Sequence, residues 1–358
     1  MAEPAAAETR SRRSRSERDR SERDRFEVFG DRSASRWPLV LTAVVMAALA
    51  AAPVWVEATD RGYLVTVLTR VVIFGLAAMS LDLVVGYGGM VSLGHAAFFG
   101  AGAYTAGALT FHSLDGSALL GIPGTDQALI TWPAAAVIGG LLGVVIGGLS
   151  LRTRGVYFIM ATLAFNQMVY FLFNALEIYG GDDGVGLFAA GRSIGPFDAS
   201  DDLVFFYVCF AVLTVSVVLL NLVVRSPFGR VVRGCRDNQA RMAALGYQTY
   251  RYRLAAFALS ASITSLAGAM AVTESQFLSP TYAEWSESGE LLLMVIIGGL
   301  GSLIGGIIGA AALFLLEEFS IDVTDNWQFF VGLGLLAVVL GAPRGLTGAL
   351  LGRERRNV

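Results

Sequence analysis

Uncharged apolar runs of roughly 20 residues dominate the chain, and they restrict its possible folds more than any other feature. A helix of about that length spans the hydrocarbon core of a bilayer, where only helices and closed barrels satisfy their own backbone hydrogen bonds. The 358 residues are 55% hydrophobic and 15% charged, with a mean hydropathy of +0.62. The sequence therefore predicts an all-α polytopic membrane protein.

The number of crossings follows from where the arginines lie. Apolar runs predict crossings near 38–57, 62–84, 92–111, 129–150, 155–176, 203–224, 252–273 and 327–343. The arginine-rich segment 225–253 favours the cytoplasm, whereas 177–202 and 319–326 are acid-rich and favour the outside. Both ends of the chain are expected inside, so the number of crossings must be even. The apolar stretch 289–318, with its glycine-rich middle, must therefore cross twice or enter and return. The prediction is about ten transmembrane helices, and eight or nine with a re-entrant segment is the alternative.

The two ends of the chain differ from the middle. Residues 1–36 are rich in Arg, Ser, Glu and Asp and carry too few large apolar side chains to fold alone, which predicts a disordered cytoplasmic tail. A transmembrane domain is predicted over 37–350 and a cytoplasmic C-terminal tail over 351–358, with the segment 274–288 outside. The basic clusters of the first tail make membrane lipid an expected partner, although interleaved acidic residues nearly cancel their charge. No nucleic-acid partner is expected, because the basic charge is not concentrated on one face.

Several chemistries are excluded by residue type. The chain contains no lysine, so it cannot supply the lysine of a phosphate-binding loop, and any ATP must be bound by another subunit. Cys209, Cys235, His95 and His112 do not have metal-ligand spacing, so neither a metal nor another cofactor is predicted. No nucleophile with a paired base is evident, so we do not expect an enzyme. A secondary transporter is the alternative from another class, but it should carry an ion site near the midplane.

Ordered segments of the chain closely resemble the LivM-type permeases of branched-chain amino acid ABC importers. The likeness covers about 84–350 and rests on GYGGMVSLGHAAFFGAGAYTAG (86–107), LRTRGVYFIMATLAFNQMVYFLFN (151–174), GGDDGVG (180–186), SPFGRVVRGCRDNQARMAALG (226–246), LLLMVIIGGLGSLIGGIIGAA (291–311) and WQFFVGLGLLAVVLGAPRGL (327–346). The resemblance implies a type II ABC importer fold in a bacterial cytoplasmic membrane. It also implies a LivH-like permease partner, two ATP-binding subunits and an external substrate-binding protein. Branched-chain amino acids are the implied substrates, while urea, amides or other small polar solutes remain alternatives.

The resemblance also places a coupling helix for the ATPases in the cytoplasmic segment. The family pattern falls on Arg236, Asp237, Asn238, Gln239, Ala240, Arg241, Met242, Ala243, Ala244, Leu245 and Gly246, with Asp237 where glutamate is more usual. A short amphipathic helix needs apolar residues to fill a partner groove, and Met242, Ala243 and Leu245 are suited to this. Gly246 can end the helix. The alternative is a solvated loop whose arginines only set the topology.

Polar residues inside apolar runs are candidates for the translocation path because burying them in a bilayer is costly. Ser92 and His95 are three residues apart and would share a helix face, and Asn166 and Gln167 lie in the middle of a crossing. His95 could instead be a neutral imidazole satisfied by a backbone carbonyl. Arg70 is expected to snorkel or to pair across helices rather than to bind substrate.

Two further patterns point to a docking loop and to an internal repeat. Asp182 and Asp183 lie in a glycine-rich outer loop and are candidates for docking the binding protein, although the same residues suit an ordinary solvated turn. The segment GGMVSL (88–93) is repeated as GGLGSL (298–303), which suggests two related halves of the kind common in transporters. Glycine-rich membrane helices can also resemble one another by composition alone.

Overall fold

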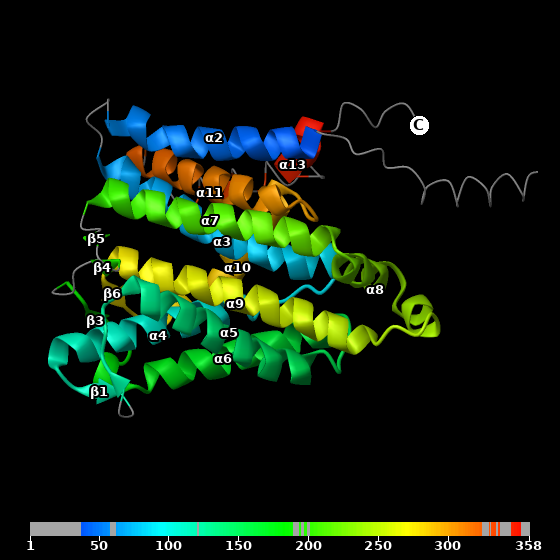
Figure 1. Cartoon of the computed structure of the whole chain (residues 1–358), viewed down its shortest axis with the longest axis horizontal. Helices are drawn as coiled ribbons and strands as arrows, with labels where there is room; N and C mark the ends of the chain where they lie inside the picture. Colours follow the sequence, from blue (N-terminus) through cyan, green and yellow to red (C-terminus); the bar gives the residue numbers. More distant parts are fainter. Residues whose placement is uncertain are drawn as a thin grey trace, which may run out of the picture. The chain divides into compact units, whose positions relative to one another are not determined.

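The computed structural model in Figure 1 describes residues 37–57, 62–119, 122–188, 193–194, 197–198, 201–323, 329, 331–333, 336 and 345–351. The predicted tail 1–36 and most of the predicted crossing near 327–343 lie outside these residues. One compact unit ends at Val44, and helix α2 (Trp37–Glu57) begins in it. The second unit, from Val45 onward, contains every element described below.

The second unit is almost entirely helical within its described part. Its long helices are α3 (Tyr63–Asp82), α4 (His95–Asp115), α5 (Ala128–Ser150), α6 (Val156–Asn174), α7 (Asp202–Arg225), α9 (Thr249–Ser275) and α11 (Leu303–Val323). Shorter helical elements are the π-helical turn η1 (Leu83–Tyr87), η2 (Glu177–Tyr179), α8 (Pro227–Ala244), η3 (Pro280–Ala283), α10 (Trp285–Gly298) and α13 (Gly345–Leu351). Among the described residues, six helices are long and apolar enough to cross a membrane. The predicted all-α polytopic class is confirmed.

Two-residue strands join the loops at one end of the bundle, at the left of Figure 1, while α8 lies at the other end. Each pairing is antiparallel: β1 (Ala118–Leu119) with β2 (Ile122–Pro123), β3 (Val185–Gly186) with β6 (Phe277–Leu278), and β4 (Ser193–Ile194) with β5 (Phe197–Asp198). The β3–β6 pair ties the loop after α6 to the segment after α9. The other two pairings each lie within one loop.

The stretch 289–318 folds as an antiparallel hairpin. A Cβ on Gly298 would touch the carbonyl of Gly305, and one on Gly309 would touch that of Met294, so the two arms run side by side in opposite directions. Helix α10 has only 14 residues, or about 21 Å of helix, which is shorter than the ~30 Å core of a bilayer. The hairpin was predicted, but its first arm is not a full crossing, and the count of ten helices is not established.

Two segments that are not regular α-helix enter the interior of the bundle, which differs from the prediction. Helix α4 begins at His95 rather than 92, and His95 bonds to Ser260 near the middle of α9. The segment expected to lie outside, 274–288, instead reaches the middle of α6, where the Ala283 carbonyl accepts a 2.9 Å hydrogen bond from Asn166 Nδ2. Irregular backbone at membrane depth is tolerated only where protein or a wet cavity satisfies it, and here protein groups do so.

Small residues let the central helices approach at the backbone. A Cβ on Gly102 of α4 would lie 1.7 Å from the Ser265 carbonyl oxygen of α9, and one on Gly268 would lie 1.9 Å from the Phe99 carbonyl oxygen. A Cβ on Gly139 of α5 would lie 2.1 Å from the Ser265 side chain and 3.0 Å from the Ala261 carbonyl oxygen. Such contacts between glycines and neighbouring backbone are typical of helix packing in membranes.

Candidate functional site

Helix α8 is the most polar element of the bundle and covers its end at the right of Figure 1. Ser226 caps it, since its Oγ accepts a hydrogen bond from the Gly229 N–H, and Pro227 occupies the first turn. Val231, Val232 and Cys235 form its buried face. The other face is exposed from Arg236 onward and is therefore free to meet a partner.

The predicted single helix over 236–246 is wrong, because the chain breaks at Asn238. That residue has φ −158° and ψ 98°, and its Oδ1 accepts a 2.9 Å hydrogen bond from the Arg241 N–H. Asn238 therefore caps a second short helical piece, a role that asparagine fills well. This piece ends at Gly246, whose φ of 88° favours glycine. Its N–H bonds to the Ala243 carbonyl and the Tyr247 N–H to the Met242 carbonyl, the two bonds of a Schellman motif.

The second piece presents a small apolar surface to the solvent. Ala243 is exposed, and the Leu245 side chain is 67% exposed. Met242, predicted to enter a partner groove, instead folds back over Gly234 within α8. The exposed apolar side chains of this piece are thus Ala243, Ala244 and Leu245, with Tyr247 exposed beside them.

Arg236 connects α8 to the two glycine-rich loops. Its guanidinium donates a hydrogen bond to the Gly86 carbonyl in the π-helical turn, and its aliphatic stem covers Gly89. Within the same cluster, the carboxylate of Asp82 accepts a 2.8 Å hydrogen bond from the Gly301 N–H. The loops that carry the repeated sequence pattern therefore meet beneath α8.

The repeated loops also share a backbone feature. Gly89 and Gly299, which occupy the same place in the two patterns, have φ values of 65° and 112°, which other residues rarely adopt. Arg233 makes a second set of contacts from α8. Its guanidinium lies 5.8 Å from the centre of the Tyr87 ring and donates a 2.6 Å hydrogen bond to the Val224 carbonyl. Arg233 and Arg236 thus hold α8 against the η1 turn after α3 and the end of α7.

His95 is completely buried, with both ring nitrogens hydrogen-bonded to hydroxyls. Ser260 donates its only hydroxyl proton to the Ser80 carbonyl at 2.6 Å, so it must accept from Nε2–H of His95 at 3.0 Å. Ser92 accepts from the Gly94 N–H and can therefore donate to Nδ1 at 3.2 Å. The arrangement fits a neutral imidazole, which was the alternative to a pathway role, except that hydroxyls rather than a backbone carbonyl satisfy it.

Among the other path candidates, Ser92 contacts His95 directly. Ser92 precedes α4 instead of lying on it, so it does not share a helix face with His95, although the two side chains touch. Asn166 is buried and holds Ala283 in place, and its Oδ1 has no hydrogen-bond partner among the described residues. Gln167 is half-buried.

Asp182 and Asp183 are exposed on a turn after η2. The turn is anchored by Tyr179, whose hydroxyl lies 3.1 Å from Nε2 of His112, and His112 also meets Ser117. Burial raises the pKa of the Tyr179 hydroxyl. The two aspartates are thus presented on a fixed surface.

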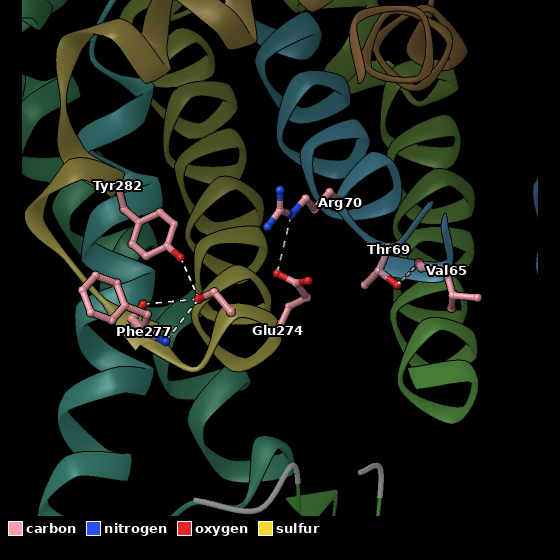
Figure 2. Close-up of polar contacts among 7 residues, drawn as sticks. Val65, Thr69, Arg70, Glu274, Phe277 and Tyr282 are labelled. Atoms are coloured by element: carbon pink, nitrogen blue, oxygen red, sulfur yellow. Dashed lines mark hydrogen bonds and ion pairs between the residues drawn. The ribbon is translucent and has the colours of Figure 1, made fainter. Parts of the chain in front are cut away.

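Glutamates line a cavity that was not predicted from the sequence. Figure 2 shows Arg70 of α3 facing Glu274 at the end of α9, with Nε and Oε2 3.9 Å apart, so Arg70 does pair across helices. The Tyr282 hydroxyl lies 2.8 Å from the Ser275 hydroxyl. Glutamates at 287, 290 and 317 line the same space. Their signal in the sequence was a set of acidic residues bordering apolar helices.

Residues 63–340 match the family described as the branched-chain amino acid transport system / permease component. The chain belongs to this permease family. The match covers the helices from α3 through α11, with α8 and both glycine-rich loops. The permease is therefore a multi-pass membrane protein and a transport subunit rather than an enzyme.

Curated relatives of the permease are transport proteins too. It is 28% identical to the high-affinity branched-chain amino acid transport system permease protein LivM of Escherichia coli, over 88% of this chain and 76% of that protein. It is also 28% identical to LivM of Salmonella typhimurium, over 84% and 74% of the two chains. Identity to BraD of Pseudomonas aeruginosa is 23%, over 77% of this chain and 91% of the relative. No solved structure matches the permease.

Proposed function

We propose that the chain is the permease subunit of an ATP-binding-cassette importer that moves branched-chain amino acids delivered by an external binding protein. The family match over residues 63–340 and the relatives named as branched-chain amino acid permeases support this substrate class. The absence of lysine from the sequence supports ATP binding by separate subunits.

The complete importer would contain a second, LivH-like permease and two ATP-binding subunits. The chain would lie in a bacterial cytoplasmic membrane with about ten crossings and both termini inside, as the positions of its arginines favour. Asp182 and Asp183 would meet the binding protein, which their exposure on an anchored turn supports.

In this proposal the second piece of α8 receives the motion of the ATPases. The observation that carries the assignment is that an exposed surface at Ala243 and Leu245 lies just beyond the cap at Asn238, only a few residues from Arg236, which contacts Gly86. A displacement at the surface would be passed to the end of α3 and to the loop of the α10–α11 hairpin. A loop that only set the topology would need arginines but not this contact.

Reconstitution tests the proposal directly. The purified chain alone should neither hydrolyse ATP nor take up leucine, whereas proteoliposomes holding all partners should take up leucine only with ATP inside. Leucine uptake by the chain alone would favour a secondary carrier. The solute retained by the purified binding protein distinguishes branched-chain amino acids from urea, amides and other small polar solutes.

A further inference from the structure

The glutamate-lined cavity lies between α3, the end of α9 and the α10–α11 hairpin and has a volume of about 380 Å³. Cavities that hold small molecules typically measure about 300–1,000 Å³. Residues from the first part of helix α10 line the cavity. The segment from β6 to η3, which precedes α10, lies in the interior of the bundle. The cavity therefore reaches from the end of α9 toward the middle of the neighbouring helices.

Its charges are unbalanced. Four glutamates (Glu274, Glu287, Glu290 and Glu317) line it together with one arginine, Arg70. Oε2 of Glu287 is inaccessible to solvent and has no hydrogen-bond partner among the described residues. A buried carboxylate without a donor is costly, so this oxygen is suited to receive a cationic N–H group from a ligand.

Apolar side chains line the cavity as well. They include Phe74, Leu293 and Leu313, on α3, α10 and α11 respectively. Arg70 is held loosely, because its Nε lies 3.9 Å from Glu274 and its side chain is 54% exposed. The guanidinium is therefore free to form a second, bidentate contact with an added carboxylate.

We infer that this cavity binds an α-amino acid with an apolar side chain on its way through the permease, as a substrate site within the membrane subunit. Glu287 and Glu290 receive its ammonium group, Arg70 its carboxylate, and Phe74, Leu293 and Leu313 its side chain. The inference rests on the proposed function, because it assumes that the transported solute is an amino acid.

Binding to the whole complex without binding protein tests which groups are recognised. Leucine, 3-methylbutylamine and 4-methylpentanoate share an apolar chain but carry both charges, the amine only or the carboxylate only. Titration calorimetry should show leucine binding best, the amine about tenfold or more weakly, and the carboxylate not measurably. Equal binding of leucine and 4-methylpentanoate would overturn the ammonium assignment, and so would a response to sodium chloride but to none of the three organic ligands.

Matched variants locate the site. Glu287→Gln and Glu290→Gln remove one charge each with little change of shape, while Glu318→Gln makes the same change on α11 at a residue that does not line the cavity. We expect leucine affinity to fall at least about tenfold in each of the first two and to be unchanged in the third. Thermal melting of each complex checks folding, and if Glu287→Gln fails to assemble, Glu290→Gln decides the test.

The two hypotheses fail in different ways. If the wild-type complex takes up no leucine, the proposed function is wrong. If it takes up leucine while all three glutamine variants bind and transport leucine equally, the importer assignment stands and the cavity is not its substrate site.

Discussion

The backbone N–H of Gly301 donates a 2.8 Å hydrogen bond to Oδ1 of Asp82, although 219 residues separate them along the chain. The bond joins the end of α3 to the loop of the α10–α11 hairpin, directly beneath the contact of Arg236 with Gly86. Asp82 is completely buried, so its position depends on this partner. The cluster is thus a single packed unit on which α8 rests.

Replacing Gly86 with alanine should disrupt this cluster. The added Cβ would lie 2.0 Å from Oδ1 of Asp82 and 2.3 Å from the Gly301 nitrogen, so the hydrogen bond between them would have to break. Overpacking of this kind typically costs about 1–3 kcal/mol. Thermal melting of the purified chain in detergent should show a clear decrease. Gly289→Ala is the control, because its Cβ meets nothing within 4 Å, and equal melting of the two variants would contradict the packing argument.

Two substitutions of Gly246 distinguish backbone strain within the chain from contact with a partner subunit. Its φ of 88° is unfavourable for valine, whereas asparagine tolerates positive φ better, and a Cβ there meets no atom of this chain within 4 Å. We expect Gly246→Val to melt lower than wild type and Gly246→Asn to melt normally. Both should lose ATP-driven leucine uptake in the full complex, because each adds a side chain where an ATPase would dock. Normal uptake by Gly246→Asn would show that no partner packs closely on this residue.

Ala243→Glu should uncouple the importer without unfolding the chain. The residue is exposed, so the permease itself tolerates a carboxylate, but a carboxylate buried unpaired in a partner groove costs several kcal/mol. Leucine uptake and substrate-stimulated ATP hydrolysis should both fall strongly in the reconstituted complex. Gln248→Glu adds the same charge at an exposed position just beyond this surface and should transport normally. Wild-type uptake by Ala243→Glu would move the coupling surface elsewhere.

Ser260→Ala tests the hydrogen bonds around His95. The substitution leaves the buried Nε2–H of His95 without an acceptor, which typically costs about 1–3 kcal/mol. The melting temperature of the chain should therefore decrease. Ser262→Ala on the same helix removes only a bond to the Ala136 carbonyl, and α5 already satisfies that carbonyl, so its effect should be smaller. A larger effect at Ser262 would argue against the imidazole network.

Single-cysteine labelling tests the predicted topology, in a variant in which Cys209 and Cys235 are replaced by alanine. Asp183→Cys and Ala240→Cys place single thiols at exposed positions on the two predicted sides. A membrane-impermeant maleimide should reach the first in intact cells and the second only after permeabilisation. The opposite pattern would show that the orientation is the reverse of the predicted one. Labelling of both thiols in intact cells would exclude the predicted topology, because both positions would then lie outside.

The sequence predicted the elements whose hydrophobic length is set by the bilayer. Helices α5 and α7 coincide with their apolar runs to within a few residues. The start of α4 was misplaced because residues 88–94 have the same apolar, small-residue composition as a helix. Only the bonds of Ser92 and His95 reveal that this segment is irregular inside the bundle, and those bonds come from distant parts of the chain.

The candidate site was predicted unevenly for the same reason. The exposure of Ala243 and Leu245 agrees with an amphipathic pattern that is local in the sequence. The break at Asn238 competes with helix propensity and is decided by one side-chain bond to Arg241. The cavity was missed because Glu287 belonged to a segment expected to lie outside, whereas a tertiary contact at Ala283 draws that segment inward.

The backbone contacts among α4, α5 and α9 have a mechanical consequence. Gly102, Gly139 and Gly268 leave no compliant layer of long side chains between these helices, so they cannot slide past one another without separating. Helices α4, α5 and α9 should therefore move together as one rigid body. The pathway should then open and close at the edges of this rigid body rather than between its helices.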